Sequence, residues 1–237
     1  MSDLKLNGVT PDGIGKIKLG STDVQKVYSG STLVWPPLGS GEVEICEYVW
    51  TTTNSVSTLL TNGNNMVIVG NYSDFEFNTN QGVPCAFYYD FNIANSAYGL
   101  YYNRFAMQQI EPPVGFRVPV LDDWNKTQGC VALTGYNPPN YNALGTSSSE
   151  WDWGVADTTS LGSSGLNILP IGRAVLLPSS PFQNFGEAGF IWTKAVGSGI
   201  DQLYGVIGSF GSTTLPWIQE VNTSPQSASP MRFVKDA

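Results

Sequence analysis

Histidine is absent from this 237-residue sequence, and charged residues of either sign are scarce. Histidine is the commonest general base and the commonest transition-metal ligand, so its absence removes the usual route to both kinds of site. Only 13% of the residues are charged, and just 11 residues are Lys or Arg. Because a phosphate-binding surface needs clustered Lys and Arg, we expect no nucleic-acid partner. The net charge of -8 favours solubility instead.

No apolar run is long enough to span a membrane, so we expect no membrane insertion. Cysteine is also scarce. Cys46, Cys85 and Cys130 form no CxxC pair, so a zinc site is not expected. We expect free, buried thiols that act as small hydrophobic side chains, with a single disulfide as the alternative. Residues 1–5 lack a basic start followed by an apolar core, so a signal peptide is not expected.

Hydrophobic and turn-forming residues are plentiful by contrast. The sequence is 41% hydrophobic and 12% aromatic, which is enough to bury a sizeable core in one large domain, with or without an appendage. The 26 glycines and 15 prolines indicate many turns and few long helices. We therefore expect a β-rich protein with long loops.

The N-terminal segment contains a small internal repeat. Residues 14–22 and 24–36 each read as short alternating strands, and the Gly-Ser-Thr of residues 20–22 recurs at 30–32. Two such hairpins cannot bury a core alone, so they need a larger body on which to pack. A Pro-Pro-Leu-Gly-Ser-Gly stretch at 36–41 then reads as a linker. We divide the chain into a hairpin module at 1–37, a linker with first strands at 38–65, and a main domain at 66–237.

The main domain is expected to combine short strands with a helix at residues 121–133. Pro119 biases the preceding residue away from helical angles, and Asp122 and Asp123 suit the first turn of a helix. Residues 134–165 are rich in small polar residues and read as a functional loop. Strands are predicted at 43–50, 55–60, 66–72, 86–91, 203–207 and 229–236.

Five phrases in a fixed order carry a family resemblance. They are YGLYY from residue 98, VGFRVPVLDDW from 114, LNILPIGR from 166, GFIWT from 189 and MRFVKD from 231. Together they resemble the Fibrobacter succinogenes major paralogous domain, known from Bacteroidetes-type bacteria and their phages, over residues 66–237. The resemblance implies an α+β, C-type-lectin-like domain with short mixed strands, one or two helices and long loops. It also implies that four signature residues are structural: Arg117, Trp124, Trp192 and Arg232.

The sequence departs from that family's pattern at three positions. Phe233 stands where the family has cysteine, so the family's terminal disulfide is missing, which suits folding in a reducing cytosol. Val120 replaces a helix-capping threonine, and Thr193 replaces a serine. The N-terminal hairpins, in turn, resemble the N-terminal modules of phage virion proteins.

Two polar segments contain the candidate ligand-binding residues. Aromatic side chains stand among small polar residues in segments 134–165 and 208–228, at Tyr136, Tyr141, Trp151, Trp153 and Trp217. Such a mixture suits stacking on sugars or contact with a protein, although the same rings would also serve to fix long loops to the core. We predict no cofactor and no metal, because calcium ligation by Asp152 and Asp157 is not required by the family resembled.

These observations favour a bacteriophage virion protein, a fibre-tip or spike-tip adhesin that binds a host surface glycan or protein. The N-terminal module would contact other virion proteins, a homo-oligomer with a trimer favoured would add avidity, and the protein would be made in host cytoplasm and released by lysis. A purely structural decoration or connector protein is the alternative. A glycan-acting enzyme is less favoured, because its candidate carboxylates are of the usually solvated kind: Asp122, Asp123, Glu150, Asp152 and Asp157.

Overall fold

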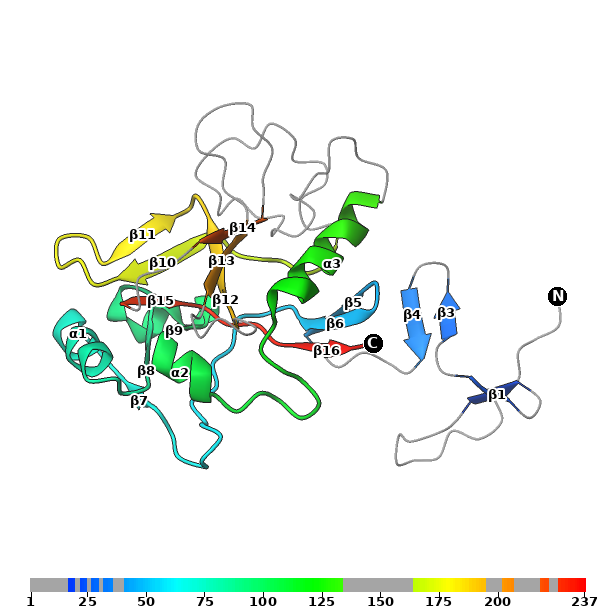
Figure 1. Cartoon of the computed structure of the whole chain (residues 1–237), viewed down its shortest axis with the longest axis horizontal. Coiled ribbons are helices and arrows are strands. Elements are labelled where there is room, and N and C mark those ends of the chain that lie inside the picture. The colour runs from blue at the N-terminus through cyan, green and yellow to red at the C-terminus, as the bar shows by residue number, and fades with distance from the viewer. Residues whose placement is uncertain are drawn as a thin grey trace.

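The computed structural model describes residues 41–133, 164–194 and 226–237, apart from the side chains of residues 128 and 131–133. It also gives the backbone of six further strands (Figure 1). These are β1 (Ile17–Leu19), β2 (Thr22–Val24), β3 (Val27–Ser29), β4 (Thr32–Trp35), β13 (Gln202–Val206) and β14 (Ile218–Val221).

A nine-stranded sheet forms the centre of the domain. Its order is β14-β13-β12-β10-β15-β9-β8-β7, and β11 pairs with β10 outside this path. The sheet is mostly antiparallel, with parallel pairing only between β7 and β8 and between β10 and β12 among the described strands. The remaining bounds are β7 (Val67–Ile68), β8 (Cys85–Tyr88), β9 (Leu100–Asn103), β10 (Ile171–Val175), β11 (Phe182–Phe185), β12 (Gly189–Thr193) and β15 (Ser227–Ser229).

A smaller sheet joins the two ends of the domain. Strands β5 (Glu42–Ile45) and β6 (Tyr48–Thr51) form a hairpin, and β16 (Val234–Asp236) pairs with β6, so the C-terminus lies beside this hairpin (Figure 1). Residues 42–51, which we placed with the linker and first strands, therefore share a sheet with the last strand of the main domain.

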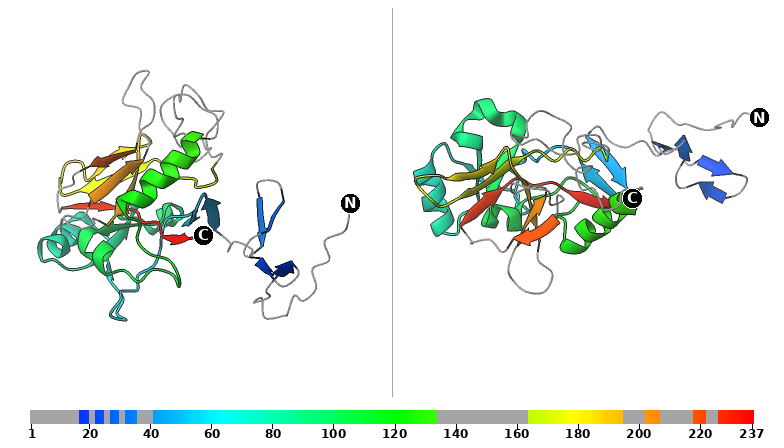
Figure 2. Two further views of the ribbon diagram at one scale, coloured as in Figure 1. Left: turned by 45° about the vertical axis from the view of Figure 1, so that its right-hand side comes forward. Right: turned by 90° about the horizontal axis from the view of Figure 1, so that it is seen from above.

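In the part of the chain that the structure describes, three α-helices accompany the sheets, which confirms the α+β class but corrects the expectation of one or two helices. They are α1 (Tyr72–Asn80), α2 (Arg104–Gln109) and α3 (Leu121–Leu133), with 3-10 turns η1 (Tyr89–Phe91) and η2 (Ile93–Tyr98). Asn71 and Asn103 cap α1 and α2 by accepting hydrogen bonds from backbone N–H groups of the first turn. Helix α3 lies by the β5–β6 hairpin, away from α1 at the β7–β8 end of the main sheet (Figures 1 and 2).

The middle strands of the main sheet are buried on both faces. Because side chains alternate along a strand, Leu100 and Tyr102 face one core cluster while Tyr101 faces the other. Helix α2 contributes Ala106 and Met107 to the first cluster, and α1 contributes Phe75 to the second. The predicted strand at 86–91 is confirmed only over β8, which packs Ala86 and Phe87 into different clusters, whereas residues 89–91 form η1.

Several predicted strands have different bounds in the structure. The predicted strand at 43–50 is the β5–β6 hairpin, turning at Cys46, whose φ is 59°. Residues 55–60 form only isolated bridges rather than a strand, and the predicted strand at 66–72 has two paired residues before α1 begins. The predicted helix at 121–133 is confirmed at both ends.

The N-terminal repeat forms two hairpins. Strand β1 pairs with β2 and strand β3 with β4, each across a Gly-Ser pair. Neither hairpin is paired with another of the described strands.

Candidate functional site

Arg117 and Asp123 organise the start of α3. The Arg117 guanidinium donates two hydrogen bonds to the Asp123 carboxylate, one of them 2.7 Å long, and this interaction raises the pKa of Arg117. The same carboxylate accepts a hydrogen bond of 2.7 Å from the backbone N–H of Val120. Asp123 thus supplies a capping interaction where Val120 has no side-chain oxygen. Arg117 also joins its backbone to Val234, which ties this turn to the C-terminal strand.

Two buried tryptophans pack against each other beneath α3. The rings of Trp50 and Trp124 lie 4.4 Å apart, and both side chains are fully buried. Their indole N–H groups donate to the hydroxyls of Thr127 at 3.1 Å and Thr193 at 3.0 Å. The structure therefore places the signature residue Trp124 in the core.

The signature residues Trp192 and Arg232 are also buried. Trp192 donates its indole N–H to the carbonyl oxygen of Tyr102 at 2.7 Å and so links β12 to β9. Arg232 lies between the segment that follows β6 and the segment that precedes β10, and Asn54 accepts a hydrogen bond from its Nε at 3.0 Å. The side chain of Arg117, in contrast, is 42% exposed.

A disulfide corrects the expectation of three free thiols. Cys46, in the β5–β6 turn, is bonded to Cys130 in α3, with a Cα–Cα distance of 6.3 Å. The two residues are 84 positions apart, so sequence spacing carried no signal for this pair. Cys85 is free and buried, and burial raises the pKa of its thiol to about 12.

The five aromatic residues predicted to bind a ligand lie outside the described residues. Tyr136, Tyr141, Trp151, Trp153 and Trp217 therefore stay predictions. The same holds for three of the candidate carboxylates: Glu150, Asp152 and Asp157.

The two described candidate carboxylates do not form an opposed catalytic pair. Asp123 is engaged by Arg117, and Asp122 is exposed and pairs with Lys126 at 3.1 Å, one turn along α3. Among the described residues, no group of three or more potential metal ligands is clustered, and no helix has the length and apolar character needed to cross a membrane.

An aromatic cluster underlies the turn after β8. The rings of Phe87, Phe91 and Phe182 are in mutual contact, with centroid distances from 4.9 to 6.1 Å. Asp90 and Phe91 both have a φ of 53°, in the left-handed region that non-glycine residues seldom adopt. Backbone strain of this kind is typical of functional turns, and here it fixes the position of the Phe91 ring.

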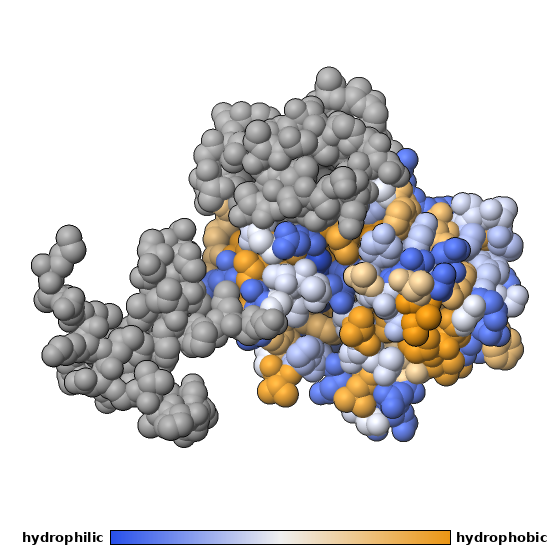
Figure 3. Space-filling model, turned by 180° about the vertical axis from the view of Figure 1, so that it is seen from behind, coloured by the Kyte–Doolittle hydropathy of each residue, from blue (hydrophilic) through white to orange (hydrophobic). Residues whose placement is uncertain are grey.

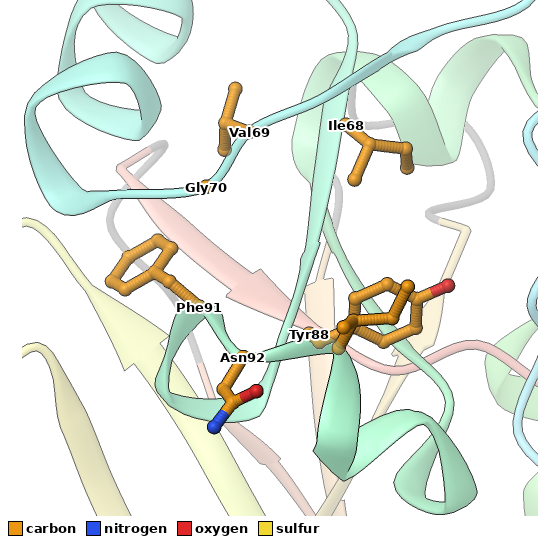
Figure 4. A pocket seen from close by; sticks show the side chains of 7 residues that line it. Ile68, Val69, Gly70, Tyr88, Phe91 and Asn92 are labelled. Atoms are coloured by element: carbon orange, nitrogen blue, oxygen red, sulfur yellow. The ribbon is translucent and has the colours of Figure 1, made fainter.

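An apolar hollow of about 330 Å³ opens beside this turn (Figure 4). Residues 68–70 lie on one side of the hollow, and Tyr88, Phe91 and Asn92 lie on the other. Ile93 completes the lining and is 71% exposed, while Ile68 of the edge strand β7 is 42% exposed. We call this group of residues, 68–70, 88 and 91–93, the apolar hollow.

Strand β7 and the turn after β8 expose hydrophobic side chains, among them Val67, Ile68 and Ile93. The space-filling view from behind shows hydrophobic side chains gathered on the side of the molecule that carries α1 and β7 (Figure 3). The sequence predicted a strand at 66–72 but not that Val67 and Ile68 would be exposed on an edge strand. Such exposed patches mark binding surfaces in soluble proteins.

A second, polar cavity of about 340 Å³ lies beside Arg232. Its lining combines polar residues with two apolar ones: Thr52, Thr53, Asn54, Asn167 and Arg232, with Ala97 and Leu169. Gly99 permits the close packing behind it, because a Cβ at that position would lie 2.6 Å from the Cβ of Asn54. We call this group the Arg232 cavity.

A comparison with protein families gives one match. The model of the Fibrobacter succinogenes major domain matches residues 43–235. This span begins in β5 and ends in β16, so it includes the small sheet and extends further towards the N-terminus than the resemblance at 66–237. Neither the curated proteins nor the solved structures contain a significant match.

Proposed function

The chain belongs to the Fibrobacter succinogenes major domain family, and from this premise we propose that it is a bacteriophage virion adhesin. In this proposal the family domain is a C-type-lectin-like head at the tip of a fibre or spike, and it binds a glycan or protein on the host surface. The proposal is supported by an exposed apolar site on the domain and by the separate N-terminal hairpins.

The apolar hollow is the observation that carries the proposal. It combines the exposed side chain of Ile93 with the rings of Tyr88 and Phe91 and the amide of Asn92. Aromatic faces stack on the apolar faces of sugar rings and on apolar protein side chains, while an amide supplies directional hydrogen bonds. The strained turn at Asp90 and Phe91 holds this surface in a fixed shape, which reduces the entropy lost on binding.

The N-terminal hairpins support attachment to a larger particle. Each is a two-stranded sheet of three or four residues per strand, which is too small to be stable alone. Contact with other virion proteins, or among copies in a homo-oligomer such as a trimer, would bury them. Multiple copies would also strengthen weak binding at each head by avidity.

The disulfide is compatible with a protein that works outside cells. Disulfides persist in oxidising surroundings, which a virion protein meets once the host has lysed. The Cys46–Cys130 bond would then stabilise the head in its place of action.

Binding of the purified full chain to intact bacterial cells and to an array of bacterial surface polysaccharides tests this function. We expect the chain to bind to the cells or to a polysaccharide and not to cleave the polysaccharide. Ile93→Asp should weaken retention about tenfold or more, because it places a charge in the apolar contact.

Val114→Asp is the matched control for this experiment. Val114 is fully exposed and does not line the apolar hollow, so the variant should bind as the unmodified chain does. Absence of binding to any cell or polysaccharide would favour the structural decoration or connector role, and shortening of the polysaccharide would favour an enzyme.

A further inference from the structure

Arg232 carries a positive charge into the core, where its described hydrogen-bond acceptors are all neutral. Its residue is 1% exposed, and its donors contact Asn54 Oδ1 and three backbone carbonyl oxygens, those of Thr51, Leu166 and Asn167. In the part of the chain that the structure describes, no carboxylate forms an ion pair with it. Buried charges in proteins are normally paired, so this arrangement calls for an explanation.

The neutral acceptors leave part of the guanidinium available. A guanidinium has five N–H groups, and the hydrogen bonds of Arg232 account for four of them. The same guanidinium lines the Arg232 cavity. Burial lowers the pKa of Arg232 to about 9, and a nearby negative charge would oppose this effect.

The rest of the cavity is suited to a polyol. The hydroxyls of Thr52 and Thr53 and the amide of Asn167 line it, and none of them has a side-chain hydrogen-bond partner among the described residues. Thr53 and Asn167 are exposed, so the cavity opens to solvent. Its volume of about 340 Å³ lies at the lower end of the range for small-molecule sites.

We propose that the Arg232 cavity binds an acidic sugar, a hexuronic acid unit, with its carboxylate beside the guanidinium and its hydroxyls on Thr52, Thr53 and Asn167. A carboxylate oxygen can accept a hydrogen bond from the remaining N–H of the guanidinium, and the carboxylate supplies the missing counter-charge. A phosphate carries a larger charge than the single cation in the described lining can balance. The hydroxyls and amides add contacts that a simple anion such as acetate would not use.

This site is separate from the apolar hollow, because the two share no lining residue. The inference therefore does not depend on the adhesin function. It would give the head a preference for acidic polysaccharides if that function holds.

Calorimetric titration of the full chain with sodium D-glucuronate, D-glucose and sodium acetate tests the ligand class. Glucose has the same ring without the carboxylate, and acetate has the carboxylate without the ring. We expect glucuronate to bind at least about tenfold more tightly than either, since a charge-assisted hydrogen bond is lost with glucose and the polyol contacts are lost with acetate. Equal binding of glucuronate and glucose, or no binding of glucuronate, would overturn the proposal.

Two variants of Thr53 test the location of the ligand and leave the buried Arg232 and its hydrogen bonds unchanged. Thr53→Glu places a carboxylate at the exposed rim, where it both repels the ligand and supplies a counter-charge to Arg232. We expect glucuronate affinity to fall about tenfold or more while Tm rises by about 2–4 °C relative to Thr53→Gln. Thr53→Gln has the shape of the glutamate without its charge, so it loses only the hydroxyl contact and should bind glucuronate less tightly than the unmodified chain but about tenfold or more tightly than Thr53→Glu.

Equal glucuronate affinity in the Thr53→Glu and Thr53→Gln variants would place the ligand elsewhere and refute the site. Val114→Asp should retain glucuronate binding, because Val114 lies outside both sites. Ile93→Asp distinguishes the two proposals: it should lose cell binding and retain glucuronate binding.

Discussion

At the scale of single residues, buried polar groups fix the positions of the large aromatic rings. Trp50, Trp124 and Trp192 each donate an indole N–H to a defined acceptor, and all three are buried. A ring held in this way has one orientation rather than several, because the alternatives would leave a buried donor unsatisfied. The polar partners, small threonines and a backbone carbonyl, are therefore as important to the core as the rings.

The hydrogen bond between Trp50 and Thr127 gives a direct test. Thr127→Val keeps the shape of the side chain but removes the acceptor, which leaves the buried N–H of Trp50 unsatisfied. We expect the free energy of unfolding to fall by about 1–3 kcal/mol in urea denaturation. Thr61→Val, at an exposed position, should change it by less than about 0.5 kcal/mol. Equal effects of the two substitutions would show that this hydrogen bond does not stabilise the core.

At the scale of elements, α3 is held in place by contacts in its first turn and in its later turns. Asp123 joins the helix start to Arg117, and the bond between Cys130 and Cys46 joins its later turns to the β5–β6 hairpin. The helix is thus attached to the small sheet by a charge pair and by a covalent bond.

Asp123→Asn tests the contribution of the charge pair. The amide retains an oxygen for the N–H of Val120 but loses the ionic interaction with Arg117, which is partly exposed. We expect a loss of about 1–2 kcal/mol in the free energy of unfolding, measured by urea denaturation at low salt. Asp122→Asn is the control, because Asp122 pairs with Lys126 only at the surface, and its loss should cost less than about 0.5 kcal/mol. A smaller effect at position 123 than at 122 would contradict the role of Asp123.

The sequence predicted α3 to the residue but missed α1, and the difference has a physical cause. Pro119 and the acidic first turn mark the start of α3 directly. Helix α1 buries only Phe75 and Thr79, so it has no apolar stripe, and only its cap at Asn71 marks it. The hairpin turn at Cys46 was hidden because it contains neither glycine nor proline.

The candidate sites could be predicted from the sequence even less well than the helices. The apolar hollow brings residues 68–70 beside residues 88–93 through the parallel pairing of β7 and β8. The Arg232 cavity combines residues 52–54, 97, 167, 169 and 232, which only the tertiary fold brings together. Sequence reasoning treated Arg232 as structural and directed the ligand to aromatic residues outside the described part of the chain.

At the scale of the whole molecule, the core contains ionisable groups that are held neutral. Burial raises the pKa of Cys85 to about 12, and it raises the pKa of Tyr101 and Tyr102 as well. The unfolded chain ionises these groups from pH 9 to 10, whereas the folded chain keeps them protonated. The unfolded state therefore binds fewer protons at these three groups in this range, so their contribution to stability falls as pH rises. Arg232, whose pKa burial lowers to about 9, contributes with the opposite sign.

We expect the free energy of unfolding of the unmodified chain, relative to that of the Cys85→Ala variant, to be constant up to about pH 9 and to fall between about pH 9 and 12. The initial slope for one group is about 1.4 kcal/mol per pH unit once the unfolded thiol is ionised. This difference isolates the thiol, because Arg232 and the tyrosines titrate alike in both proteins. A difference that stays constant to pH 11 in urea denaturation would show that Cys85 is not buried in the folded state.

The position of Cys46 determines how far this domain unfolds when force is applied from its N-terminal side. Tension entering at residue 41 would reach β5 first, an edge strand of the small sheet that can be peeled from β6 one hydrogen bond at a time. Peeling would stop at the next residue after β5, where the covalent bond to α3 transfers the load past the hairpin to the body of the domain. A head tethered at its N-terminal side would thus extend by about the length of β5 and then resist further unfolding.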